Sequence, residues 1–249
     1  MAWWNQYPGI NPIFTFDATS PAGAGVGMAH NHKIISNIYQ GAGRVFPSSI
    51  LSNSGGSIEG YQTLRFNKSE LQLSPAIKIP KEFTMILKVK VYTSSTFLSN
   101  NGSNYGLIYG TGTSETTDGL WRMYGYTSPQ GGRNLQQRLK EDLPNIFDVV
   151  LKGNVITKSC TLTINGTTHV IPPSSGLFDN FLKPDYSFTT IGDNYGNTTW
   201  GPNADVIAYG LFDSEMSEEQ LKQVFINIDL QFKKTSTDRA SQVFNILPT

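Results

Sequence analysis

Apolar and polar residues alternate through one stretch in the middle of the chain. Residues 83–91 read FTMILKVKV, and every second position from the first is apolar: Phe83, Met85, Leu87, Val89 and Val91. A period of two places these side chains on one face of a β-strand, so we predict that they point into a core. The same pattern recurs further on, at Phe147, Val149 and Leu151.

Two strand-like runs flank an Asn-Gly pair. Residues 161–164 read TLTI, Asn165 and Gly166 follow, and residues 167–171 read TTHVI. Both central residues of a type I′ turn need a positive φ, which asparagine and glycine tolerate, so we predict a β-hairpin. Residues 206–212 are apolar almost throughout, as expected of a strand that is covered on both faces.

One later segment has the pattern of a helix. Ser217 stands three residues before Gln220, which is the spacing of a capping box at the start of a helix. Apolar residues then follow at i, i+3, i+4 and i+7, at Leu221, Val224, Phe225 and Ile228. This spacing forms one helical face, so we predict a short helix near residues 217–228.

Composition agrees with a folded β-protein. Hydrophobic residues make up 38% and charged residues 15% of the 249 positions, whereas a disordered chain carries more charge and fewer aromatic residues. Residues 1–60 hold several prolines and glycine clusters, so we predict a loop-rich N-terminal arm or an elaborated sheet edge. An ordinary loop-rich lead-in is the alternative. We assign the sandwich itself to residues 61–232 and a C-terminal tail to residues 233–249.

Charge and cysteine content limit the partners and the compartment. Lysine plus arginine equals aspartate plus glutamate, at 19 each, so the net charge gives no reason to expect a nucleic acid partner. No stretch approaches the ~20 apolar residues of a membrane span, so we expect no membrane insertion. There is no signal-peptide pattern, and Cys160 is the single cysteine, so we expect the chain to fold in the cytoplasm without a disulfide.

Four segments, taken in order, resemble a known family. They are residues 64–67 with 83–86, residues 162–166, residues 190–192, and residues 204–221. Together they resemble laminin-G-like and pentraxin-like domains of the concanavalin A-like lectin and glucanase superfamily, over roughly residues 60–230. The resemblance implies an all-β jelly roll, a sandwich of two antiparallel sheets, with one short C-terminal helix. It implies no single function, because the fold hosts lectins, adhesion modules, glycosidases and viral spike parts.

The sequence offers no catalytic constellation. Glycosidases of this superfamily carry Glu-x-Asp-x-Glu on one strand, so that alternate carboxylates reach the cleft. No such spacing occurs here: Glu141 and Asp142 are adjacent, and Glu218 and Glu219 stand at the predicted helix start. We therefore predict no catalytic residues. We also predict no cofactor, because phosphate-loop, nucleophile-elbow and complete dinucleotide motifs are missing.

Metal ligands are too sparse for a metal site. Calcium is common in the superfamily but needs several converging oxygen ligands, and Asp118, Asp193 and Asn194 are the loop residues on offer. His30 and His32 share a face if their segment is extended, but two ligands are too few within one chain. We predict no metal site.

Two loop segments combine flat aromatic rings with hydrogen-bonding side chains, the combination that binds sugars. The first lies within residues 118–134 and the second within residues 193–200. The candidate ligand-binding residues are Trp121, Arg122, Tyr124, Tyr126, Asp193, Asn194, Tyr195, Asn197 and Trp200. The alternative places Trp121 in the core of a strand that carries Tyr124 and Tyr126 on its other face.

These observations lead to a hypothesis of a non-catalytic carbohydrate- or receptor-binding module. Laminin-G-like modules usually act outside cells, yet this chain shows no export signal, and a virion protein leaves the cytoplasm by lysis. We therefore expect a structural or attachment component of a phage virion or tail. Its partners would be a glycan or cell-surface receptor and other virion subunits, with homo-oligomerisation left open. A free lectin made inside the cell and a glycoside hydrolase of the same fold are the alternatives.

Overall fold

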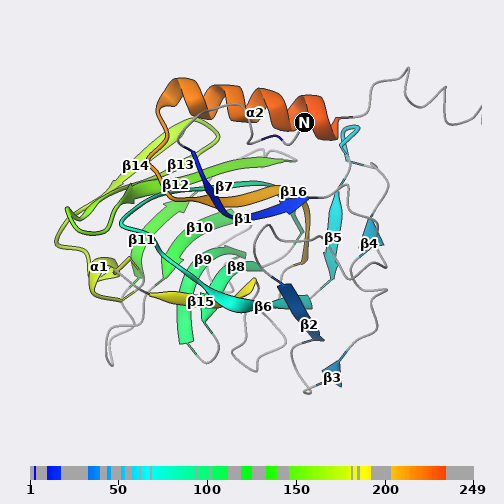
Figure 1. Cartoon of the computed structure of the whole chain (residues 1–249), viewed down its shortest axis with the longest axis horizontal. Coiled ribbons are helices and arrows are strands. Elements are labelled where there is room, and N and C mark those ends of the chain that lie inside the picture. Colours follow the sequence, from blue (N-terminus) through cyan, green and yellow to red (C-terminus); the bar gives the residue numbers. More distant parts are fainter. Residues whose placement is uncertain are drawn as a thin grey trace, which may run out of the picture.

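The structure is a computed structural model (Figure 1). It describes residues 3, 10–17, 33–39, 44–45, 52–53, 58–61, 63–67, 69–92, 95–100, 103–111, 119–124, 133–138, 146–180, 182–183, 186–191 and 203–233. The account below is confined to these residues. The predicted C-terminal tail, His30 and His32, and Asp118 lie outside them.

Two antiparallel sheets make up the fold. The first has the order β14-β13-β12-β7-β16-β5-β4, with β1 also paired to β16. Its strands are β1 (Pro12–Asp17), β4 (Ser52–Asn53), β5 (Leu64–Asn67), β7 (Glu82–Val91), β12 (Phe147–Asn154), β13 (Ser159–Ile164), β14 (Thr167–Ile171) and β16 (Asn203–Phe212).

The second sheet has the order β11-β10-β9-β8-β15-β6-β2-β3. Its strands are β2 (Lys33–Tyr39), β3 (Arg44–Val45), β6 (Ser69–Lys78), β8 (Ser95–Asn100), β9 (Ser103–Thr111), β10 (Gly119–Tyr124), β11 (Arg133–Arg138) and β15 (Ser187–Ile191). The helices are α1 (Leu177–Asn180) and α2 (Glu218–Phe232). The predicted fold class, an all-β two-sheet sandwich with one C-terminal helix, is confirmed; the single turn α1 was not predicted.

Strand β16 organises the first sheet. One of its edges pairs with β7, and its other edge is shared by two strands that are distant in the sequence. Residues 203–206 pair with β5, and residues 208–212 pair with β1. The register against β7 shifts between Val206 and Ala208, at the point where the neighbour changes. Three strands from residues 1–60 also belong to the sheets: β1 lies in the first sheet, and β2 and β3 lie in the second.

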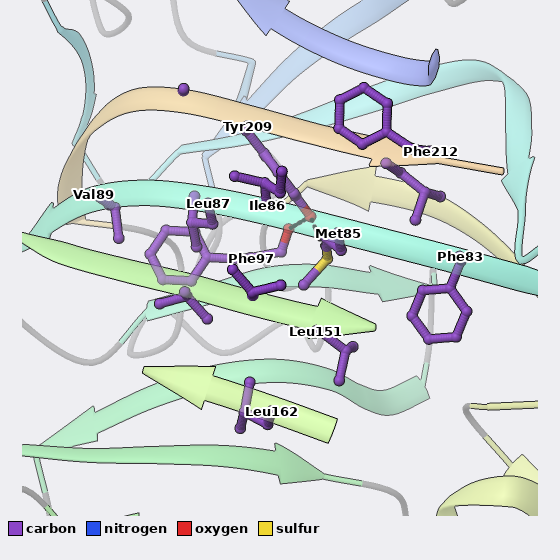
Figure 2. Packing of buried hydrophobic residues seen from close by; sticks show 14 of the residues in the cluster. Phe83, Met85, Ile86, Leu87, Val89, Phe97, Leu151, Leu162, Tyr209 and Phe212 are labelled. Carbon is purple, nitrogen blue, oxygen red and sulfur yellow. Dashed lines mark hydrogen bonds between the residues drawn. The ribbon is translucent and has the colours of Figure 1, made fainter. Parts of the chain in front are cut away.

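The core between the sheets is built on the predicted face of β7. Phe83, Met85, Leu87 and Val89 are all buried, as predicted, and Figure 2 shows them beside Leu151, Leu162 and Tyr209. The second sheet contributes Phe97, Trp121, Met123 and Phe188 to the same cluster. The alternating pattern therefore identified the correct inward face.

Helix α2 covers the opposite face of the first sheet (Figure 1). The capping box is present: Ser217 accepts from the backbone N–H of Gln220, and the Gln220 side chain accepts from the backbone N–H of Ser217. Leu221, Val224 and Ile228 are buried, and the helix extends to Phe232, four residues beyond the predicted end. Because α2 covers this face, β7 is buried on both sides from Phe83 to Val89.

Trp3 fills a slot between α2 and β16. Its indole meets the Phe212 ring edge-on, with centroids 5.8 Å apart, and its carbonyl accepts from the Asn227 side chain at 3.3 Å. A Cβ atom at Gly210 would lie 2.9 Å from the tip of the Trp3 ring. Glycine is therefore needed at position 210 so that the indole can approach the strand.

The Asn-Gly hairpin forms as predicted. Asn165 and Gly166 have φ values of +48° and +81°, the left-handed pair that a type I′ turn requires. Leu162 stands opposite His169 in the ladder between β13 and β14. Cys160 is buried, and burial raises the pKa of its thiol.

One hydrogen bond connects the two sheets through the core. The hydroxyl of Tyr209, on β16, donates to the carbonyl of Phe97, on β8, at 2.8 Å (Figure 2). The register between β8 and β9 shifts between Thr96 and Leu98, so Phe97 lies at an irregularity where its carbonyl can turn inward. Burial raises the pKa of the Tyr209 phenol far above its ordinary value, so the group stays a donor.

We predict that Tyr209→Phe lowers the free energy of unfolding by about 1–3 kcal/mol, because a buried carbonyl then loses its donor. Urea unfolding followed by tryptophan fluorescence measures the change. An unchanged dependence on urea concentration would show that the core itself is intact. A loss below about 0.5 kcal/mol would contradict the importance of this bond.

Candidate functional site

The predicted ligand-binding residues fall into three groups. Trp121 is completely buried; its ring stacks on Phe97 at 5.8 Å and meets Phe147 edge-on at 5.4 Å. Arg122 and Tyr124 lie on β10, but the positions of their side chains are outside the described part. The remaining candidates lie wholly outside the described residues: Tyr126, Asp193, Asn194, Tyr195, Asn197 and Trp200. For Trp121 the structure supports the core alternative over the surface one.

Strand directions constrain how the two candidate loops can meet. In the second sheet β10 pairs with β9, β9 with β8, and β8 with β15, which makes three antiparallel steps from β10 to β15. An odd number of such steps makes β10 and β15 run in opposite directions. The chain therefore leaves β10 after Tyr124 in one direction and leaves β15 after Ile191 in the other. The two candidate loop segments therefore begin at opposite ends of the second sheet, and the loops themselves lie outside the described residues.

Among the described residues, the densest group of charged side chains lies under α2. The ammonium of Lys88 lies 3.0 Å from Asp148 on β12 and 3.1 Å from Asp229 on α2. The hydroxyl of Tyr61 donates to the same Asp229 oxygen at 2.7 Å. The Lys88 nitrogen also lies 5.1 Å from the centre of the Tyr61 ring and 5.7 Å from that of Phe225, close enough for a cation–π contribution.

Burial and charge oppose each other in this group. Burial alone would lower the pKa of Lys88, but the carboxylates of Asp148 and Asp229 outweigh it and hold the pKa above its ordinary value. Burial raises the pKa of Asp148, and Lys88 offsets that only in part. Burial and the hydrogen bond to Asp229 raise the pKa of Tyr61 to about 12. Lys88 therefore keeps its charge between the two aspartates, and the Tyr61 phenol beside them stays protonated at neutral pH.

This charged group is suited to holding the fold together. The Lys88 side chain is only 7% exposed and already contacts both carboxylates, so an outside anion has no route to its ammonium. A second polar group continues along the same face, where Asp205 accepts from Tyr92 and from Thr63. The sequence signal for the Lys88 group is a lysine inside an otherwise apolar run, at a position that alternates with the predicted core face.

Metal-binding clusters and membrane-spanning helices are absent from the described ranges. Within them, no cluster of three or more His, Cys, Asp or Glu side chains is arranged to hold a metal ion. No helix there is long and apolar enough to cross a membrane.

Comparison with protein-family models finds no match for this chain, and comparison with curated proteins finds none either. Solved structures do match it. Domain 4 of AbnA, an extracellular arabinanase from Geobacillus stearothermophilus, in complex with arabinotriose, superposes with a TM-score of 0.51. The identity is 10%, and the match covers 86% of this chain and 98% of that domain.

Trypanosoma rangeli sialidase in complex with 2,3-difluorosialic acid superposes with a TM-score of 0.50 at 13% identity. The match covers 88% of this chain but 33% of the sialidase, so the chain spans about one third of that protein. At such identities the likeness shows the fold alone. The chain is therefore an antiparallel two-sheet β-sandwich of the jelly-roll type.

We predict that Lys88→Met lowers the free energy of unfolding by about 2–4 kcal/mol, because two carboxylates then lose their shared counter-charge. The value lies below that of a fully enclosed pair because both carboxylates are partly exposed. Lys158→Met is the matched control: Lys158 pairs with Asp179 at an exposed site, so its loss should stay within about 0.5 kcal/mol. Equal urea midpoints for the two variants would contradict the prediction.

Stability should also fall between pH 10 and pH 12 in a manner that depends on Tyr61. Unfolded tyrosine releases its proton near pH 10, whereas folded Tyr61 keeps it to about 12. Deprotonation thus favours the unfolded state as pH rises. The pKa of Lys88 is raised as well, so its loss of a proton at high pH also favours the unfolded state. This contribution is present in the wild type and in the variant. The unfolding free energy of Tyr61→Phe should therefore fall less steeply with pH, and parallel curves for both proteins would contradict this.

Proposed function

We propose that this chain is a non-catalytic carbohydrate- or receptor-binding module. The observation that carries the proposal is the match along 98% of a single domain that was solved in complex with arabinotriose. A match along nearly the whole of that domain compares one complete sandwich with another. A sandwich of this kind offers loops at its ends for ligand binding on a rigid frame.

The residues proposed to bind the ligand are those of the second loop segment. Asp193, Asn194, Tyr195, Asn197 and Trp200 follow β15 directly. Rings supply flat faces for the C–H faces of a sugar, and the carboxylate and amides supply directed hydrogen bonds. Trp121 is left out of the proposed site, because its ring is enclosed by Phe97 and Phe147.

The absence of catalysis is part of the proposal. Glycoside hydrolysis needs two carboxyl groups that flank the scissile bond. The two carboxylates that meet in the described part, Asp148 and Asp229, are both engaged by Lys88, so neither is available as an acid or a nucleophile. A glycoside hydrolase of the same fold remains the competing class. Release of reducing sugar from polysaccharides above a heat-inactivated control would favour it.

The proposed setting is an attachment component of a phage virion or tail, with other virion subunits as partners. The support is the sequence: its single cysteine, Cys160, is buried, and no disulfide can form within the chain. A free lectin made inside the cell has the same features. Neighbouring genes distinguish the two, since a tail or capsid cluster would favour the virion and a polysaccharide locus would favour the free lectin.

A glycan array probed with the full chain, followed by calorimetry on any glycan that binds, tests the proposal. We predict that Trp200→Ala weakens binding about 10-fold or more, since removal of a central stacking aromatic costs ~2 kcal/mol. Its melting temperature should change little, because a surface ring contributes little to stability. Leu230→Ala, a large exposed residue on α2, is the matched control and should alter neither property.

Two results would reject the sugar site. One is an array without a bound glycan. The other is a Trp200→Ala chain that loses stability while its glycan affinity is unchanged, because the ring would then belong to the packing of the protein.

A further inference from the structure

The open edges of the two sheets are not alike. Natural proteins protect such edges by making them short, by placing charges or proline on them, or by bulges. Strands β3 and β4, each at one end of a sheet, are two residues long. Strand β11 has an arginine at both ends. Strand β1 begins with Pro12, ends with Asp17 and has an irregular register against β16.

Strand β14 has none of these protections along its length. It is the terminal strand of the first sheet, five residues long, and its register with β13 is regular. Residues 159–171, which form β13, the turn and β14, include no Asp, Glu, Lys, Arg or Pro. The Val170 side chain on β14 is 70% exposed. The edge is thus uncharged, regular and partly apolar.

The hairpin geometry determines which backbone groups of β14 face outward. Ile164 and Thr167 flank the two-residue turn, and the flanking pair of such a hairpin is hydrogen-bonded. Alternation then makes His169 and Ile171 bond to β13 as well, while the N–H and C=O groups of Thr168 and Val170 point away from it. In the described part of the chain, no backbone group pairs with them.

We propose that β14 pairs antiparallel with β14 of a second copy of this chain, about a twofold axis at His169. Thr168 then stands opposite Val170 of the second copy, and Val170 stands opposite Thr168. Both pairs are of the hydrogen-bonded kind, so the four outward groups of each copy are satisfied. The first sheets of the two copies become one continuous sheet.

A second copy fits this edge better than an unrelated strand does. The segment is self-complementary about its centre: β-branched residues meet β-branched residues at Thr168 and Val170, a favourable cross-strand combination. No side chain of the strand brings a formal charge against its own image. Pro172 follows β14 directly and ends the pairing, because proline has no N–H to donate.

Sedimentation of the full chain over a range of concentrations tests the proposal. The wild type should be a dimer. Val170→Lys should raise the dissociation constant at least about 10-fold, because each edge strand then carries a charged side chain that opposes pairing. Ile156→Lys is the matched control: it makes the same kind of change at an exposed apolar residue in the β12–β13 turn, outside the ladder. It should remain a dimer.

A cysteine pair tests the register independently of Val170→Lys. The non-hydrogen-bonded pair at the axis brings the two His169 Cα atoms to ~4.5 Å, within disulfide reach. His169→Cys should therefore form a disulfide-linked dimer on mild oxidation. Val170→Cys should not, because diagonal neighbours lie about 7–8 Å apart. Cys160 is buried and should not compete.

Three results would overturn the proposal. They are a wild-type chain that stays monomeric up to about 100 μM, a Val170→Lys chain as dimeric as Ile156→Lys, and equal cross-linking through positions 169 and 170. The pairing does not depend on a glycan ligand. A dimer without glycan binding would reject only the proposed function, and glycan binding by a monomer would reject only the pairing.

Discussion

The two central strands of the first sheet, β7 and β16, are buried on both faces, and much of the remaining structure follows from that constraint. The inner face of this sheet packs on the second sheet, and its outer face packs under α2 and Trp3. A sandwich strand usually keeps one solvated face, so polar groups on the outer face here need partners inside the protein. The hydroxyl of Thr84 donates to a carbonyl in the segment that leads into α2. Lys88 is placed between Asp148 and Asp229 for the same reason.

Helix α2 is therefore attached by three kinds of interaction along its length. Its first turn is capped by Ser217, its middle presents Val224 and Ile228 to the sheet, and its last turns connect through Asp229 to Lys88 and Tyr61. The apolar contacts supply most of the free energy, and the ion pairs fix where the helix lies. Lifting the helix would expose apolar surface and would also separate Asp229 from Lys88 and Tyr61.

Local patterns in the sequence predicted the strands and the helix well, but contacts between residues far apart in the sequence were missed. The Asn-Gly turn, the capping box at Ser217 and the inward face of β7 each depend on residues a few positions apart. Alternation shows that two faces differ in polarity, but it does not show that a helix covers the polar one, so the burial of Lys88 does not follow from it. Its partner group includes Tyr61 and Asp229, which are 168 positions apart. Most of the candidate ligand site lies beyond the described residues, and Trp121 could be assigned to the core only once Phe97 and Phe147 were seen around it.

The sharing of β16 between distant neighbours has a consequence for how the chain folds. Tyr209 on this central strand bonds Phe97, 112 positions earlier, and contacts the sulfur of Met85, 124 positions earlier. β1, which completes the other edge, is earlier still. During synthesis β7 therefore leaves the ribosome long before the strand that belongs beside it. Until then its apolar flank stays open, so folding is dominated by late, non-local pairing, which is slow and exposes the nascent chain to chaperones and to aggregation.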